Sequence, residues 1–229
     1  MVSPFIQNCV YIVSAFLFIL GLKKLSSPAT ARKGNMISAL GMFLAIVVTL
    51  LDQGIVSYQG IAIGMAVGTV VGVAGARLIA MTAMPEMVAL LNGFGGISSL
   101  LLGWAAYLST PVLGTMESVT IIFSLVIGGI TFTGSLIAWA KLSEKISGKP
   151  LQFFGQNILN SGLLIATIVL GVLFVLNPSM SMDYMYMIIG ISLILGVLSV
   201  ISIGGGDMPV VISLLNSYSG IAACAAGFV

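Results

Sequence analysis

The sequence predicts an all-α protein, a polytopic transmembrane helical bundle of about eight helices whose N-terminus lies outside. Its composition, the length of its apolar segments and the distribution of its basic residues indicate this fold. Of the 229 residues, 59% are hydrophobic and only 6% are charged, and the mean hydropathy is +1.21. A soluble domain needs a polar surface, so this composition excludes one.

The apolar segments are each about 17–25 residues long, which is the length a helix needs to cross ~30 Å of hydrocarbon. They are continuous runs rather than alternating segments of ~10 residues, which favours helices over transmembrane strands. The first is not a cleaved signal peptide, because no Lys or Arg precedes it and Lys23 and Lys24 follow it. We expect spans at residues 5–22, 35–51, 60–80, 84–108, 118–140, 155–176, 184–203 and 208–229.

The charged residues between the segments orient the chain. All eight basic residues fall in three loops that alternating helices place on one face: Lys23, Lys24, Arg32 and Lys33, then Arg77, then Lys141, Lys145 and Lys149. The opposite loops carry Asp52, Glu117 and Asp183, with no Lys or Arg. Positive charge resists translocation, so we expect the basic face and the Gly204–Asp207 turn to be cytoplasmic, with both termini outside.

The sequence gives no sign of a metal or nucleotide site within the chain. Histidine is absent, which excludes metal sites of the His/Cys kind. Cys9 and Cys224 lie in apolar segments, where we expect buried small hydrophobic side chains rather than a disulfide. The glycine-rich stretches GGGDMP and GFGGIS lack the preceding strand and the full spacing of a nucleotide-binding loop.

Two helices begin with the same pattern. MPEMVALLNGFGG (84–96) and MPVVISLLNSYSG (208–220) share Met-Pro, Leu-Leu-Asn, an aromatic residue and Gly, at a shift of 124 positions. Both copies start at the predicted cytoplasmic face, so the repeat is parallel. Pro85 and Pro209 suit the first turn of a helix. Thr82 and Asp207 lie just before, where their oxygens can accept hydrogen bonds from first-turn N–H groups.

Asn92 and Asn216 lie at matching depth, about 12 Å into their helices at 1.5 Å per residue. A buried amide needs a protein or water partner. Both could join helices by hydrogen bonds, or they could line a shared hydrated path. Ser213 lies on the same helical stripe as Asn216. In the fifth segment, Thr131 and Ser135 are one turn apart and could face the same neighbour, or bond back to their own helix.

Four stretches resemble the beta subunit of proton-translocating NAD(P) transhydrogenase, most closely the three-subunit bacterial type. They are GLKKLSSPATARKGNMISALGM, TAMPEMVALLNGFGG, GGITFTGSLIAWAKLSEKISGKP and IGGGDMPVVISLLNSYSGIAACAAGF. The resemblance extends over essentially the whole chain. It implies an oxidoreductase subunit of the bacterial inner (cytoplasmic) membrane that conducts protons, coupled to hydride transfer from NADH to NADP⁺.

The resemblance also implies partners and cofactors. The full assembly uses NAD(H) and NADP(H), while this chain alone binds no cofactor. The expected partners are an alpha subunit with an NAD-binding domain, a small membrane subunit, the NADP-binding domain of the beta subunit and a second protomer, all in a lipid bilayer and without nucleic acid.

Functional residues follow from the same resemblance. The proton route would include Asn92, Asn216, Ser135, Ser213 and Thr131. Coupling to the NADP domain would involve Asp207, with Gly205, Gly206, Glu86 and Arg77 at the same interface. Many members have His where this chain has Asn92, and an amide cannot titrate near neutral pH as His does. Three-subunit members carry a His on the small membrane subunit instead.

The chain stops at Val229, within or at the end of its eighth predicted helix, whereas the family adds a ninth helix and then the NADP domain. We therefore expect residues 1–229 to be the transmembrane proton-channel domain, present as a fragment, a split-gene product or a truncated chain. An alternative function is a small secondary transporter built on the parallel repeat, which would need helices broken at mid-membrane. A purely structural anchor is a third.

Overall fold

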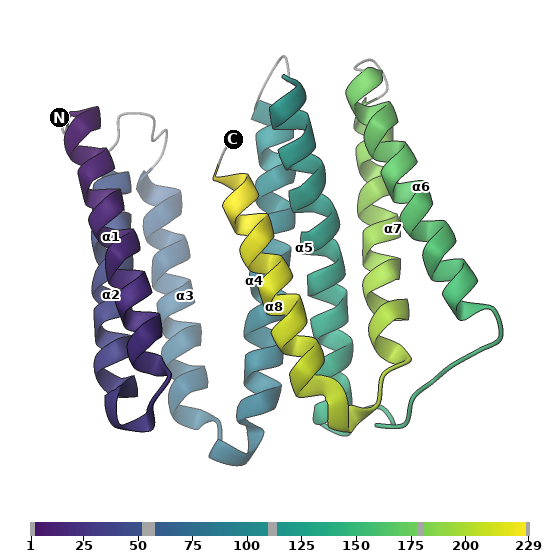
Figure 1. Cartoon of the computed structure of the whole chain (residues 1–229), viewed down its shortest axis with the longest axis horizontal. Coiled ribbons are helices and arrows are strands. Elements are labelled where there is room, and N and C mark those ends of the chain that lie inside the picture. The colour runs from purple at the N-terminus through teal and green to yellow at the C-terminus, as the bar shows by residue number, and fades with distance from the viewer. Residues whose placement is uncertain (1–2, 52–57, 110–113, 178–180, 228–229) are drawn as a thin grey trace. The chain divides into compact units, whose positions relative to one another are not determined.

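The computed structural model describes residues 3–51, 58–109, 114–177 and 181–227, and most of these residues form long helices (Figure 1). The described residues contain eight helices long and apolar enough to cross a membrane. The predicted all-α fold is therefore confirmed, while the side on which the N-terminus lies stays a prediction. Asp52 and Val229 lie outside the described residues. The helices are α1 Pro4–Leu25, α2 Pro28–Leu50, α3 Tyr58–Leu78, α4 Met84–Ser109, α5 Thr115–Leu142, α6 Gln156–Leu176, α7 Ser181–Ile201 and α8 Met208–Ala226.

Most helix ends agree closely with the predicted segments, and α2 is the exception. It begins at Pro28 rather than near residue 35, with the proline in its first turn. The first turns of α2 include Arg32 and Lys33. Hydropathy detects the part of a helix that suits hydrocarbon, so it misses helical turns that extend into a polar, basic segment.

The chain divides into two compact units, Met1–Val73 and Ala74–Val229. In the first unit, α1 and α2 form a hairpin whose helices approach closely at glycines. A Cβ placed on Gly34 would lie 2.8 Å from the carbonyl oxygen of Gly21. Nearer the other end, the Tyr11 hydroxyl and the Thr49 hydroxyl lie 2.9 Å apart. Small residues at such contacts are the usual means of packing helices in membranes.

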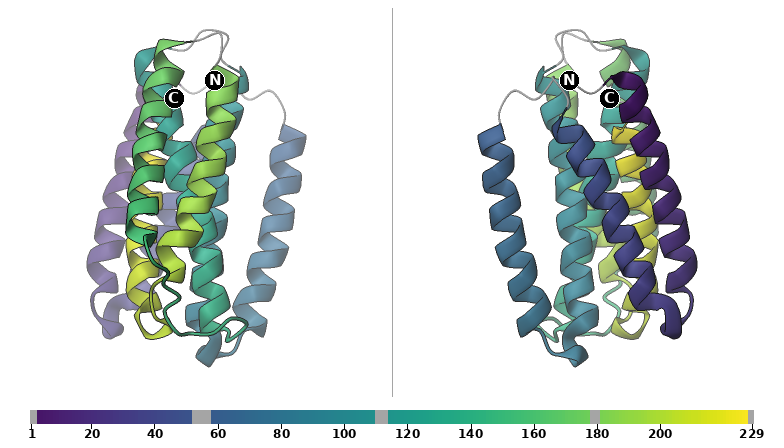
Figure 2. Two further views of the ribbon diagram at one scale, coloured as in Figure 1. Left: turned by 90° about the vertical axis from the view of Figure 1, so that its right-hand side faces the viewer. Right: turned by 90° about the vertical axis from the view of Figure 1, so that its left-hand side faces the viewer.

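In the second unit, α4 to α8 run alternately up and down, and α5 is the central helix (Figures 1 and 2). Helices α4, α6, α7 and α8 all contact α5. Two clusters of buried apolar side chains fill the spaces around it. One consists of Ala89, Ala138, Val200, Met208, Val211, Ile212 and Leu215, and the other of Leu100, Ile121, Leu125, Phe174, Met185 and Ile188.

Glycines set the distance between α4 and α5. A Cβ on Gly96 would lie 2.7 Å from the Phe132 nitrogen and 2.9 Å from the Gly128 carbonyl oxygen. A Cβ on Gly128 would lie 2.7 Å from the Gly96 carbonyl oxygen. The two backbones are in direct contact there, so neither position has room for a side chain. This close approach places the polar residues of α4 within hydrogen-bond reach of α5.

Cys9 on α1 and Cys224 on α8 are free thiols, and both are exposed. The expectation that they are buried is therefore wrong. In a membrane helix the lipid-facing surface is as apolar as the core, so an apolar run does not tell which of its residues face inward.

Candidate functional site: a polar cleft between α4 and α8

The repeat seen in the sequence continues in the backbone. A 3-10 turn at Met81–Ala83 precedes α4, and one at Gly205–Asp207 precedes α8. The residue before each turn has nearly the same torsions, φ −66° and ψ 151° at Ala80 and φ −68° and ψ 151° at Gly204. These elements are related by the same shift that aligns the two helices. The two copies therefore share a turn and a helix, with Pro85 and Pro209 in the first helical turn as expected.

Asn92 joins three helices. Its Nδ2 donates a hydrogen bond of 2.9 Å to the Ser135 hydroxyl on α5. Its Oδ1 accepts one of 3.2 Å from the Ser219 hydroxyl on α8. Asn92 is 8% exposed and Ser135 is fully buried. The amide thus lies about 12 Å from the start of α4, with both ends of its side chain held by protein hydroxyls.

A cleft of about 330 Å³ opens beside this amide between α4 and α8. Six of its lining residues form three pairs related by the repeat: Val88 and Ile212, Asn92 and Asn216, Gly95 and Ser219. Leu91 and Ser213 complete the lining. The cleft therefore lies where the two copies of the repeat face each other.

Asn216 differs from Asn92 in its environment. It is exposed at the cleft, and among the described residues its side-chain amide has no hydrogen-bond partner. The Ser213 hydroxyl donates to the Pro209 carbonyl oxygen of its own helix at 3.0 Å. The Asn216 amide and both lone pairs of the Ser213 hydroxyl therefore stay free in the cleft, among the described residues, and they can bind water.

Thr131 lies apart from the cleft. It is fully buried where α4 and α5 cross, beside Gly96. Its hydroxyl has no hydrogen-bond partner among the described residues. A buried hydroxyl left without a partner costs about 1–3 kcal/mol. The back-bond to its own helix, one of the two alternatives for Thr131, is therefore absent among the described residues.

Of the predicted proton-route residues, hydrogen bonds join Asn92 and Ser135, and the cleft brings Asn216 and Ser213 beside Asn92. The sequence reasoning missed Ser219 and Gly95. Ser219 lies three positions after Asn216, so helical spacing already put it on the same face. Gly95 gave no signal of its own, because glycine in a membrane helix is usually explained by packing.

Asp207 lies at the start of α8, but it does not cap the helix as expected. Its backbone has φ −93° and ψ −2°, and its side chain makes no capping hydrogen bond. A capping side chain requires an extended backbone at that residue. The preceding 3-10 turn gives Asp207 a helical conformation instead, so its carboxylate is exposed and, among the described residues, forms no ion pair. Thr82 likewise lies within a 3-10 turn.

Lys141 holds the residues that lead into the turn containing Asp207. This side chain, only 4% exposed, donates to the carbonyl oxygens of Ile201 at 2.7 Å and Ile203 at 2.6 Å. It also donates to the Lys149 carbonyl oxygen at 3.3 Å. The sequence reasoning had treated Lys141 as a loop charge. The last turn of α5 instead fixes the end of α7 and the residues that lead into the second 3-10 turn.

The glycines of that turn have different surroundings. The Gly205 N–H donates to the Gly148 carbonyl oxygen at 2.8 Å, and a Cβ on Gly205 would lie 3.3 Å from the Gly148 Cα. A Cβ on Gly206 would meet no atom within 4 Å. Gly205 is therefore packed against the loop after α5, while Gly206 and Asp207 form an open surface.

Arg77 and Glu86 flank the equivalent turn of the first copy. Arg77 is in the last turn of α3 and Glu86 in the first turn of α4. Arg77 is exposed and Glu86 is half-buried. In the described part of the chain neither takes part in an ion pair, so both charges are free to meet a partner.

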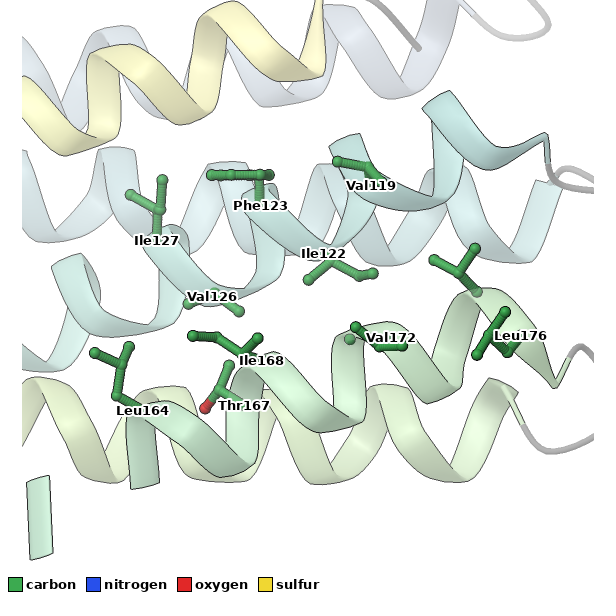
Figure 3. A pocket seen from close by; sticks show the side chains of 12 residues that line it. Val119, Ile122, Phe123, Val126, Ile127, Leu164, Thr167, Ile168, Val172 and Leu176 are labelled. Atoms are coloured by element: carbon green, nitrogen blue, oxygen red, sulfur yellow. The ribbon is translucent and has the colours of Figure 1, made fainter. Parts of the chain in front are cut away.

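A larger hollow of about 520 Å³ lies between α5 and α6, away from these polar groups (Figure 3). Its lining is apolar apart from Thr167, whose hydroxyl donates to the Leu163 carbonyl oxygen at 2.9 Å. Water needs two to four polar partners to be held in a cavity. This hollow therefore suits hydrocarbon rather than a proton or a polar substrate.

Comparison with known proteins shows the family of the chain. Residues 7–229 match the family described as the NAD(P) transhydrogenase beta subunit. The chain is 41% identical over 226 residues to the NAD(P) transhydrogenase subunit beta of Rhodospirillum rubrum, covering 95% of this chain and 48% of that protein. The same values hold for the protein of R. rubrum strain ATCC 11170. The chain thus spans about half the length of the curated relatives it matches, and it belongs to the NAD(P) transhydrogenase beta subunit family.

Proposed function

We propose that this chain is the membrane part of a proton-translocating NAD(P) transhydrogenase and forms part of its proton path. The observation that supports this most is the polar cleft between α4 and α8. It places two amides, Asn92 and Asn216, about 12 Å from the starts of two parallel membrane helices. Polar side chains at such depth are costly unless they are used.

The chemistry of the cleft suits a short chain of water molecules. An amide both donates and accepts hydrogen bonds, so it can orient water without a charge that hydrocarbon would penalise. The volume of about 330 Å³ has room for several water molecules. Among the described residues no titratable side chain lines the cleft. A proton carrier would therefore come from elsewhere, and we propose a His on a helix of the small membrane subunit.

We further propose that the second 3-10 turn is where the membrane part meets the NADP-binding domain. The exposed carboxylate of Asp207 and the open surface at Gly206 support this. Lys141 binds the Ile203 carbonyl oxygen just before the turn, and the Gly148 carbonyl oxygen accepts the N–H of Gly205 within it. Because the turn is held at these points, we propose that a movement of the NADP-binding domain against Asp207 would shift α8 rather than deform the turn. Arg77 and Glu86 would extend the same contact surface.

The proposed assembly lies in the bacterial inner membrane. There it would couple proton movement to hydride transfer from NADH to NADP⁺, with NAD(H) bound by the alpha subunit and NADP(H) by the remaining part of the beta subunit. A dimer of such protomers is the proposed complex. The cytoplasmic side would be the one that carries the basic loops.

The alternative of a secondary transporter finds no support in α4 and α8. Both helices are continuous through the depth of the cleft, and their prolines lie in the first turn. Transporters of that kind usually bind substrate where helices are interrupted at mid-membrane.

Substitution of Asn216 by Leu tests the proton path. In the full-length assembly reconstituted into proteoliposomes, Asn216→Leu should abolish proton uptake measured with a pH-sensitive dye, because leucine cannot order water. Hydride exchange between bound nucleotides should continue, since the soluble domains are unchanged. Ser217→Leu is the matched control, because Ser217 is the next residue on α8 but does not line the cleft. Normal proton uptake by an assembled Asn216→Leu protein would show that the amide only packs helices.

A further inference from the structure

The two repeat-related amides are held differently. The Asn92 side chain has a hydroxyl partner at each end, Ser135 at 2.9 Å and Ser219 at 3.2 Å. The Asn216 side chain has no partner among the described residues and faces the cleft. The two copies are identical at six of thirteen aligned positions, so the difference comes from the positions at which they differ and from what packs against them.

The contact between α4 and α8 explains part of this difference. The shift that takes Asn92 to Asn216 takes Gly95 to Ser219. The repeat therefore relates the pair Asn92 and Ser219 to the pair Asn216 and Gly95, and all four residues line the cleft. Glycine has no hydroxyl, so the second pair makes no such bond.

Packing does not require glycine at position 95. Among the described residues, a Cβ on Gly95 would meet no atom within 4 Å, whereas a Cβ on the adjacent Gly96 would lie 2.7 Å from the Phe132 nitrogen. The backbone does not require glycine either, because the φ of Gly95 is not positive. A glycine inside a helix costs about 1 kcal/mol relative to alanine. Among the described residues, close packing therefore does not explain the glycine at this position.

We infer that the difference between Ser219 and Gly95 makes Asn92 the fixed amide of the cleft and Asn216 the free, water-facing one. Ser219 is a positioning residue, since it fixes the orientation of Asn92 from α8. Gly95 leaves open the space into which the Asn216 amide and its water extend. A role of this arrangement in proton movement rests on the proposed function, while the accessibility of Asn216 does not.

The accessibility of position 216 is tested first, without any measurement of proton flow. In a protein with Cys9→Ser and Cys224→Ser, Asn216→Cys should react readily with a small charged thiol reagent in native membranes. Adding Gly95→Ser should slow this reaction roughly fivefold, because the serine side chain fills the open space and limits access to the thiol at position 216. Gly162→Ser is the matched control, since a Cβ on Gly162 of α6 also meets no atom within 4 Å. An unchanged rate with Gly95→Ser would overturn the inference.

Proton uptake by the full-length assembly is then measured with Asn216 intact. Gly95→Ser should lower it roughly fivefold, and Gly95→Ala should lower it less, because a methyl group cannot bond to the amide. Equal losses with both variants would overturn the hydrogen-bonding part of the inference. Slowed labelling with unchanged proton uptake would leave the free amide in place and contradict the proposed proton path instead.

Ser219 is tested by the pair Ser219→Ala and Ser219→Thr. The alanine variant should lower proton uptake roughly threefold, the typical effect of one interhelical hydrogen bond in a membrane, and threonine should restore it because it keeps the hydroxyl. A loss with both variants, or with neither, would show that the hydroxyl does not position Asn92.

Discussion

The two copies of the repeat have nearly the same backbone but different surroundings. Gly96 in the first copy corresponds to Gly220 in the second. A Cβ on Gly96 would lie 2.7 Å from the backbone of α5, while a Cβ on Gly220 would meet no atom within 4 Å. Asp207 of the second copy corresponds to Ala83 of the first. Among the described residues the first copy is thus locked to its neighbour, and the second carries an exposed acid and a free amide.

This comparison teaches that a duplicated turn and helix can be specialised without changing the backbone. The 3-10 turns have matching torsions, so the differences lie in single side chains and in what packs against them. The equivalent positions therefore supply matched controls for one another, because their backbone geometry is shared.

The largest expected effect comes from filling the contact between α4 and α5. Gly96→Leu should prevent folding or assembly, because the new side chain would meet backbone atoms of Phe132 and Gly128 that cannot move aside. Overpacking of this kind costs about 3 kcal/mol or more. Gly220→Leu should be tolerated in this chain. Yield of detergent-stable protein and its thermal unfolding measure both, and equal losses at the two positions would contradict the difference between the copies.

A smaller effect is expected at the acid that only the second copy has. Asp207→Asn should leave stability unchanged, because the carboxylate makes no capping bond. In the full-length assembly it should lower proton-coupled turnover by roughly ten- to a hundredfold, the effect of losing one charge-assisted contact of about 1.5–3 kcal/mol. Glu86→Gln in the first copy is the control, with a smaller expected loss. Full activity of Asp207→Asn would exclude a coupling role for the charge.

The smallest expected effect comes from removing the hydrogen bond between Asn92 of the first copy and Ser135 of α5. A double-mutant cycle of Asn92→Ala and Ser135→Ala should give an interaction free energy of about 0.6 kcal/mol, the average for hydrogen bonds between membrane helices. Unfolding of the purified chain in mixed detergent measures it. The same cycle with Asn216→Ala and Ser135→Ala should give about zero, because the free amide does not touch Ser135 among the described residues. Equal coupling in both cycles would show that the two amides are not held differently.

Much of the fold could be predicted from the sequence, because a membrane helix requires a continuous apolar run of known length. The depth of Asn92 and Asn216 was also predictable, since the repeat fixes their distance from the helix starts. The start of α2 at Pro28 was not, because its first turns are too polar to register as a span.

The site could be predicted only in part. Contacts of Ser219 and Lys141 depend on which helices are neighbours, and no sequence period encodes that. The conformation of Asp207 depends on the 3-10 turn before it, whereas its residue type suggested a cap. Charge and residue type thus identified the groups that matter, and tertiary packing determined which of them are paired.

The hydroxyl of Ser219 has one proton but three acceptors within reach. These are Asn92 Oδ1 at 3.2 Å, the Leu215 carbonyl oxygen at 3.2 Å and the Asn216 carbonyl oxygen at 3.0 Å. Side-chain rotations take picoseconds to nanoseconds, whereas helices shift in microseconds to milliseconds. The Ser219 proton can therefore change acceptor by rotation of a single side chain, without movement of α4 or α8.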